Sequence, residues 1–263
     1  MSNEWNAAVY HQVSAPQVSW GKKVLARISL RGDETILDAG CGTGRLTRDL
    51  LEALPRGRVV ALDVSENMID AARAYLIPDF GDRIEFVTCD LLQMTFDTQF
   101  DGIFSTASFH WVRNHEALFR GLYRALRPGG WLCAQCGGAH NLDRFLGRAH
   151  ALMETAAYAP FFHDYPFPWE FSDATTAASR LKKAGFESIE TSLEEAPTSF
   201  SDAKEFQQFV ANVILHRHLE RLPTAELRNS FLEAITSLAA QDDPPFLLDY
   251  WRLNLQARKP RTT

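Results

Sequence analysis

The sequence of 263 residues has no excess of positive charge and no long apolar run. Its formal net charge is −6 at pH 7, so no overall positive field attracts it to nucleic acid or to an anionic membrane. The first residues, MSNEWNAAVY, lack the basic and then apolar pattern of a secretion signal, and no apolar run approaches membrane-spanning length. We expect a cytoplasmic protein without nucleic-acid or membrane partners, as a monomer or a homodimer.

Cysteines are few, and no residue spacing is typical of a metal site. Of the four cysteines, Cys133 and Cys136 stand three apart in WLCAQCGG, which has the pattern of a strand. Residues three apart on a strand point to opposite faces, so this pair is poorly placed to bind a metal or to form a disulfide. The eight histidines show no zinc-binding spacing either. We expect inert thiols and no metal.

Between residues 34 and 136, short apolar runs alternate with segments of helical periodicity. This alternation favours right-handed β-α-β units around a parallel sheet, and therefore an α/β fold. The expected strands are 35–40, 58–64, 84–90, 100–108 and 130–137, and the expected helices are 44–55, 66–78 and 115–130.

The pattern changes after residue 138, where a helical segment precedes an aromatic, proline-rich stretch, APFFHDYPFPWEF. Later a helix and a strand follow, with Ser172 or Asp173 as N-cap and Gly185 as C-cap, and FLLDYWRLNLQARK alternates like a last strand. We expect one domain: a core of residues 30–138, 173–196 and 246–259, a helical cap of 139–172 and 197–245, and an N-terminal helix over 5–28.

The segment ILDAGCGTGRL, residues 36–46, joins a strand to a glycine-rich loop and places an acid, Asp38, just before it. Dinucleotide-binding loops read G-x-G-x-x-G, but here the third glycine position holds Arg45. A pyrophosphate would be repelled by Asp38, whereas a cationic ligand would be attracted. The ligand indicated is S-adenosylmethionine, which carries an ammonium and a sulfonium and no phosphate.

Two more acids end the next two expected strands. Asp63 stands about 20 residues after the loop, where an acid accepts hydrogen bonds from ribose hydroxyls, and Asp90 is placed to accept one from an adenine amino group. Each acid alone also fits a helix N-cap. Three acids at three successive strand ends favour a binding site.

These motifs, with VVALDVSENMI, VTCDLLQM, FDGIFSTASFHWV and LRPGGWLCAQCGG, resemble those of class I S-adenosylmethionine-dependent methyltransferases over residues 36–137. The segments NEWNAAVY and FHWV and the expected cap resemble the trans-aconitate methyltransferase group, with malonyl-carrier methyltransferases as neighbours. The resemblance implies a Rossmann-like, seven-stranded, mostly parallel sheet with an antiparallel last strand. The cofactor-contacting positions expected are Asp38, Gly40, Cys41, Gly42, Asp63, Val64, Met68, Asp90, Leu91, Ser105 and Tyr10.

The segment after the fourth strand should reach the cofactor's methyl group, because ligands bind beyond the carboxyl ends of such strands. Phe109, His110 and Trp111 are therefore substrate candidates, although Trp111 also fits core packing and His110 also fits a structural histidine. The expected N-terminal helix should pack across the same ends. Its Tyr10 and Gln12 could then close over the ligand or simply pack.

The expected reaction is methylation of a small molecule, with a carboxylic acid as the preferred acceptor. A carboxylate is ionised at neutral pH and needs no general base, and the sequence shows no acid–base pair in the substrate region. The alternatives are O-, N- or C-methylation of a hydroxyl, amine or carbon acid with His110 as general base, or a non-catalytic cofactor-binding module. The motif N/D-P-P-Y/F, common in base methylases, is replaced by STASFHW, which argues against a nucleic-acid substrate.

Overall fold

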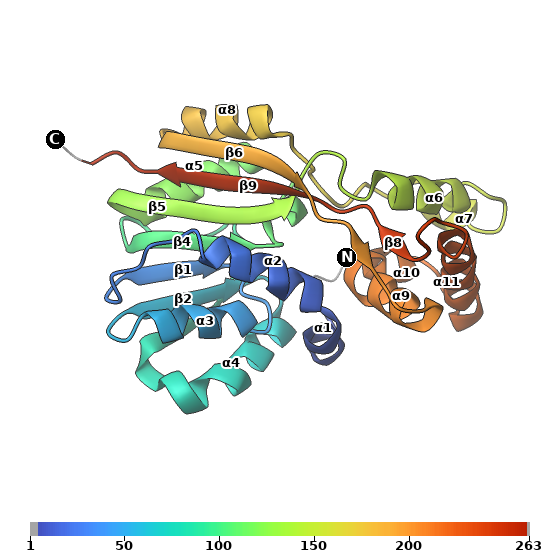
Figure 1. Ribbon diagram of the computed structural model, residues 1–263, viewed down its shortest axis with the longest axis horizontal. Coiled ribbons are helices and arrows are strands. Elements are labelled where there is room, and N and C mark those ends of the chain that lie inside the picture. Colours follow the sequence, from blue (N-terminus) through green and yellow to red (C-terminus); the bar gives the residue numbers. More distant parts are fainter. Residues whose placement is uncertain (1–4, 262–263) are drawn as a thin grey trace.

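The computed structural model describes residues 5–261 and has a seven-stranded sheet at its centre (Figure 1). The strand order is β3-β2-β1-β4-β5-β9-β6. Strand β9 pairs antiparallel with both β5 and β6, whereas the pairs among the first five strands are parallel, which confirms the expected sheet. The strands are β1 Thr35–Ala39, β2 Arg58–Asp63, β3 Ile84–Thr88, β4 Phe100–Thr106, β5 Leu126–Gly137, β6 Glu187–Glu195 and β9 Trp251–Arg258, with β7 Thr198–Ser199 and β8 Leu247–Leu248 pairing separately.

Helices cover both faces of the sheet, because its strands are apolar on both sides. On one face lie α2 (Ala15–Leu25), α3 (Arg45–Ala53) and α4 (Glu66–Phe80), and on the other α5 (His115–Ala125) and α8 (Ala174–Ala184) (Figure 1). Short 3-10 turns occupy Gly81–Arg83 and Phe109–Trp111. Cys133 and Cys136 belong to the cores on opposite faces, and both are free thiols, as the strand pattern predicts.

The cap is helical, as expected, and lies beyond one end of the sheet (Figure 1). It has an apolar core of its own, which includes Phe145, Phe206 and Phe231. A bidentate ion pair between Arg148 and Asp242, with N–O distances of 2.9 and 2.6 Å, joins its first helix to the turn after its last one. Its helices are α6 Asp143–Met153, α7 Ala159–Phe162, α9 Ala203–Phe209, a π-helix Val210–Ile214, α10 His216–Leu219 and α11 Ala225–Ala239.

The single N-terminal helix expected over 5–28 is wrong. The segment forms α1 (Ala7–Val13) and α2, which meet at Ser14, because Pro16 begins a new helix more readily than it continues one. Helix α2 packs on the sheet face beside α3, and only α1 lies near the carboxyl ends of the strands, against α4 and the π-helix.

The ends of two helices, α8 and α5, can be compared with the sequence-based predictions. Asp173 is the N-cap of α8, accepting from the Thr176 N–H at 2.8 Å, and Gly185 ends that helix at φ +105°, as predicted. The helix expected over 115–130 ends earlier, at Ala125, and the LRPGG segment already belongs to β5. In residues 5–261 no helix is long and apolar enough to cross a membrane.

Candidate active site

The glycine loop between β1 and α3 adopts backbone torsions that glycine allows most easily. Gly40, Gly42 and Gly44 have φ of +87°, +54° and +82°. A Cβ atom on Gly40 would collide with the Ser108 side chain, whereas one on Gly42 would meet no atom within 4 Å. The loop is therefore packed from behind at Gly40 and open at Gly42, which leaves room for a ligand against the backbone there.

Asp38 lies behind this loop and is only 2% exposed. Thr47 of α3 donates a hydrogen bond to its Oδ2 at 2.7 Å. Burial raises the pKa of Asp38 to about 7, the Thr47 hydrogen bond opposes this shift, and the charge of Asp63 adds to it. No cation of the described residues forms an ion pair with this carboxyl, so a cationic ligand would stabilise its ionised form.

Backbone N–H groups hold the other two strand-end acids. Asp63 accepts from Gly42 N and from Ser65 N, both at 3.0 Å, and Asp90 accepts from Leu92 N at 2.8 Å. The N-cap of α4 is Ser65, which accepts from Met68 N, so capping does not account for Asp63. The Gly42–Asp63 contact joins the glycine loop to the end of β2, and the two predicted ligand contacts are therefore neighbours.

The other predicted cofactor positions differ in accessibility. Val64 is 38% exposed at the end of β2, while Met68 and Leu91 are buried beside it. Ser105 is fully buried and donates to the Ala39 carbonyl at 2.6 Å, so its hydroxyl supports the end of β1. Burial, together with the nearby acids Asp63 and Asp38, raises the pKa of Cys41, which remains a neutral thiol.

A cavity opens over the glycine loop, and α1 covers it. Arg45, at the position where dinucleotide loops have glycine, donates to the His11 carbonyl at 3.0 Å. The His11 ring also lies 2.9 Å from the Thr43 hydroxyl. These two contacts hold α1 over the loop and carry Tyr10 to the cavity wall, as expected for a residue that closes over the ligand.

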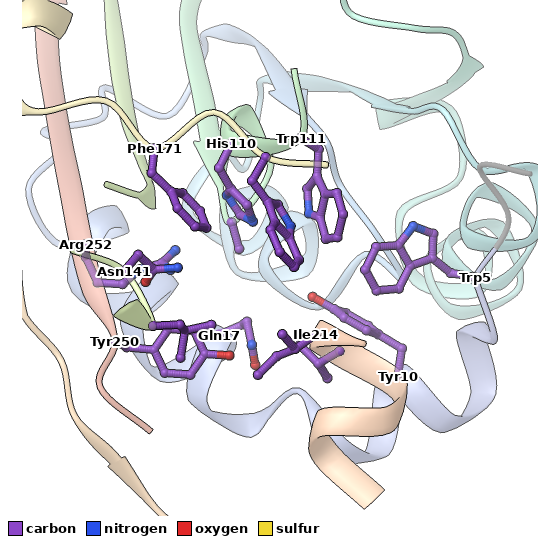
Figure 2. A pocket seen from close by; sticks show the side chains of 14 residues that line it. Trp5, Tyr10, Gln17, His110, Trp111, Asn141, Phe171, Ile214, Tyr250 and Arg252 are labelled. Atoms are coloured by element: carbon purple, nitrogen blue, oxygen red, sulfur yellow. The ribbon is translucent and has the colours of Figure 1, made fainter. Parts of the chain in front are cut away.

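A second cavity lies between the sheet and the cap (Figure 2). Tyr10, Gln17 and Ala107 line both cavities, so the two are adjacent. Its remaining wall brings together side chains from the N-terminal helices, the strand ends and the cap. These are Trp5, His110, Trp111, Asn141, Leu142, Trp169, Phe171, Val213, Ile214, Tyr250 and Arg252.

His110 points into this second cavity (Figure 2). Burial lowers the pKa of His110 well below its usual range, and the charges of Arg252 and His115 lower it further. Its Nδ1 accepts from the Gly137 N–H at 3.3 Å. Trp111 also lines the cavity and packs against Trp5 and Trp169 at ring distances of 5.4 Å, so its packing partners are the N-terminal segment and the cap rather than the helix that follows it.

Two predicted substrate residues do not reach this cavity. Phe109 is 1% exposed in the core beneath α5, where it packs against Phe119 at 6.4 Å, because the 3-10 turn directs its side chain inward. Gln12 is exposed and lines neither cavity, since the break at Ser14 turns it to solvent. The glutamine that lines both cavities is Gln17, on the helix after the break.

The residue that the sequence analysis missed most clearly is Arg252, on β9. Its side chain is buried, its Nε has no hydrogen-bond partner, and no carboxylate of residues 5–261 forms an ion pair with it, although Glu194, its register partner on β6, contributes a negative charge nearby. Its guanidinium lies 4.6 Å from the Trp20 ring, a cation–π contact. The one signal in the sequence was a charged residue inside an apolar strand pattern. A buried cation without an ion-pair partner at a cavity wall is suited to bind an anion, because the anion would neutralise its charge.

The protein resembles known methyltransferases in sequence. Residues 36–130 match the family described as methyltransferase domain. Over 97% of this chain and 98% of the relative, it is 28% identical to an uncharacterized methyltransferase of Schizosaccharomyces pombe. It is 34% identical to a trans-aconitate 2-methyltransferase of Acidovorax ebreus over 62% of this chain and 59% of the relative, and 28% identical to one of Methylobacterium nodulans over 98% and 99%.

Solved structures share the fold at low identity. Phosphoethanolamine N-methyltransferase 2 of Haemonchus contortus, solved with S-adenosylhomocysteine, superposes with a TM-score of 0.64 at 17% identity, covering 97% of this chain and 57% of that one. The [4+2]-cyclase SpnF superposes with a TM-score of 0.62 at 21% identity, covering 93% and 82%. The fold is therefore compatible with more than one reaction, and the domain match and the named relatives carry the assignment. The methyltransferase-domain match over residues 36–130, the named relatives and the shared fold together support a class I S-adenosylmethionine-dependent methyltransferase.

Proposed function

We propose that the protein transfers a methyl group from S-adenosylmethionine to the carboxylate of a small organic acid, forming a methyl ester. The observation that carries this proposal is Arg252, a buried guanidinium without an acidic partner, in the cavity that His110 also lines. A guanidinium stays charged even when buried, because its ordinary pKa is above 12. An incoming carboxylate would supply the missing counter-charge and hydrogen-bond acceptors.

The residues around the glycine loop fit the proposed cofactor. Asp38 offers a buried negative group, Gly42 leaves open space at the backbone, and Asp63 is held at the end of β2. When bound, S-adenosylmethionine supplies an electrophilic methyl group. The cavity over the loop adjoins the Arg252 cavity through Tyr10 and Gln17, so a ligand in each would meet at their shared wall.

His110 is better suited to donate a hydrogen bond than to remove a proton. A neutral imidazole carries one N–H, and the Gly137 N–H already donates to Nδ1, so the proton belongs on Nε2. An Nε2–H group can orient a carboxylate, whereas a general base needs a free nitrogen lone pair facing the acceptor. This supports an acceptor that is already ionised over a hydroxyl, amine or carbon acid.

The test is product chemistry. Purified protein would be incubated with S-adenosylmethionine and a panel of acids, phenols and amines, with S-adenosylhomocysteine release and product mass followed together. A product that gains 14 Da and loses it in mild base is the expected ester. A base-stable methyl ether, methylamine or carbon-methyl product would contradict the proposal and favour the alternative in which His110 is the base.

Arg252→Gln separates acid recognition from folding. Removing an unpaired buried cation should leave stability unchanged or raise it, while acid affinity should fall at least tenfold, as for loss of a charge-assisted hydrogen bond. Arg258→Gln, an exposed arginine on the same strand, is the matched control and should keep normal affinity.

A cytoplasmic location, the lack of nucleic-acid, membrane and metal partners, and a monomeric or homodimeric state remain predictions from composition.

A further inference from the structure

The cavity lined by His110 and Arg252, called the acceptor cavity from here on, has a charge that restricts which acids it can bind. Among its described lining residues, Arg252 is the one cationic side chain, and burial keeps His110 neutral. Most of the remaining wall is apolar or aromatic, with Trp5, Trp111 and Trp169 contributing indole rings. The other polar groups of the wall, such as Gln17, Asn141 and Tyr250, are uncharged. A second or third carboxylate in this space could form hydrogen bonds with them but would find no second cation, so burying its charge would be costly. The cavity is therefore matched to a single negative charge.

Aromatic rings line the boundary between this cavity and a larger groove in the cap. Trp169 and Phe171 stack with a ring distance of 5.7 Å and an interplanar angle of 10°, and Trp169 also lies 5.5 Å from the His218 ring. Phe171 lines both spaces, whereas His218 lines the groove alone. The groove and the cavity therefore meet at Phe171.

The groove has an empty volume of about 1420 Å³ and lies beside α6 and α7. Its lining combines apolar side chains, among them Leu146, Met153 and Phe162, with exposed polar ones, Asp143, His150 and Glu154. Phe167 in this groove is 52% exposed. Exposed apolar surface among polar residues is typical of a binding groove.

We infer that the acceptor is a monocarboxylic acid with an extended apolar chain, its carboxylate at Arg252 and its chain passing Phe171 into this groove. The inference rests on the proposed function and assigns its substrate class. The occupant is the substrate's own chain because the groove adjoins the acceptor cavity at Phe171, and because the single cation of that cavity neutralises one carboxylate.

Gly147 allows a sharp test. It lies on α6, lines the groove, and would place a Cβ atom where nothing lies within 4 Å. Gly147→Phe should fill the groove without disturbing the helix, and Gly147→Ala is the matched control. Binding of straight-chain monocarboxylates with six to sixteen carbons and of a tricarboxylate would be measured by calorimetry on the full chain with S-adenosylhomocysteine present.

With the wild-type protein and Gly147→Ala, affinity should rise about two- to fourfold per added methylene until the groove is filled. Gly147→Phe should abolish the gain for long acids and leave the six-carbon acid unchanged. A tricarboxylate that binds more tightly than every monocarboxylate, or long-chain affinity unaffected by Gly147→Phe, would overturn the inference. So would a groove that serves as a subunit contact, seen as a change of mass in solution in Gly147→Phe without any effect on acids.

This readout is independent of methyl transfer. If acids bind in the expected order and no ester forms, the proposed reaction is wrong while the ligand class holds. If esters form from tricarboxylates alone, the reaction holds and the ligand class is wrong.

Discussion

The backbone N–H of Gly137 donates a hydrogen bond to Nδ1 of His110 at 3.3 Å and so determines which ring nitrogen faces the acceptor cavity. Gly137 is also the register partner of Arg252 on β9, so the His110 ring and the Arg252 side chain are both positioned at the Gly137–Arg252 pair of the sheet. A Cβ atom on Gly137 would lie 2.8 Å from Phe171 and 2.9 Å from Asn141. Glycine at this position therefore allows the cavity wall to close around the histidine.

We predict that His110→Ala slows turnover modestly, by about tenfold, because it removes a hydrogen-bond donor and no base. His110→Gln, whose amide can donate from a similar place, should recover part of the rate. Steady-state kinetics give the measurement. A loss of roughly 10²–10⁴-fold in both variants would instead identify His110 as a general base.

Asp38 should make cofactor binding pH-dependent. Its folded-state pKa of about 7 lies above its ordinary value, so folding stability due to this group is greatest at low pH and falls as pH rises towards 7. A cationic ligand needs the ionised form, so S-adenosylmethionine should bind about tenfold more tightly at pH 8 than at pH 6 and release a proton below pH 7.

Titration calorimetry in buffers with different ionisation enthalpies measures that proton release. Asp38→Asn should bind weakly at every pH and release no proton. Affinity that is flat between pH 6 and 8 in the unmodified protein would show that Asp38 does not meet a positive charge.

Gly42→Val should lose cofactor binding while the protein stays folded. The new side chain would point into open space, so it clashes with no protein atom, but it would occupy the room needed by the ligand, and its φ of +54° costs a branched residue about 1–2 kcal/mol. Thermal unfolding and calorimetry should be compared with Gly40→Ala, which collides with Ser108 and should mainly destabilise. Normal activity in Gly42→Val would exclude the loop from the ligand site.

Asp63→Ala should weaken cofactor affinity by about 1–3 kcal/mol, because ribose hydroxyls would lose an acceptor. The carboxylate also accepts from Gly42 N and Ser65 N, so the variant loosens the loop as well. Asp63→Asn keeps the shape and one acceptor oxygen and should lose less. Unchanged affinity in Asp63→Ala would remove this residue from the site.

The local sequence pattern predicted the parallel strands and the glycine loop, whereas the antiparallel last strand was inferred from the family resemblance. Alternation of apolar runs and helical segments predicts the ends of β1 to β4 to within two residues, and β5 from Gly130 onward, since this pattern is local and follows from burial on both faces of a parallel sheet. The loop glycines and Asp38 are also local signals: positive φ demands glycine, and an acid before the loop selects the charge of the ligand.

The acceptor side was decided by tertiary structure. Gln17, His110 and Arg252 are far apart in the sequence, and they meet because α2 packs on the sheet and β9 inserts antiparallel beside β5. The side chains of the consecutive residues Phe109 and His110 point in different directions, Phe109 into the core and His110 into the cavity. Sequence periodicity cannot predict these directions within a single 3-10 turn. Arg252 reads as an ordinary strand residue until its missing partner is seen, because the lack of a counter-charge is a property of three-dimensional neighbours.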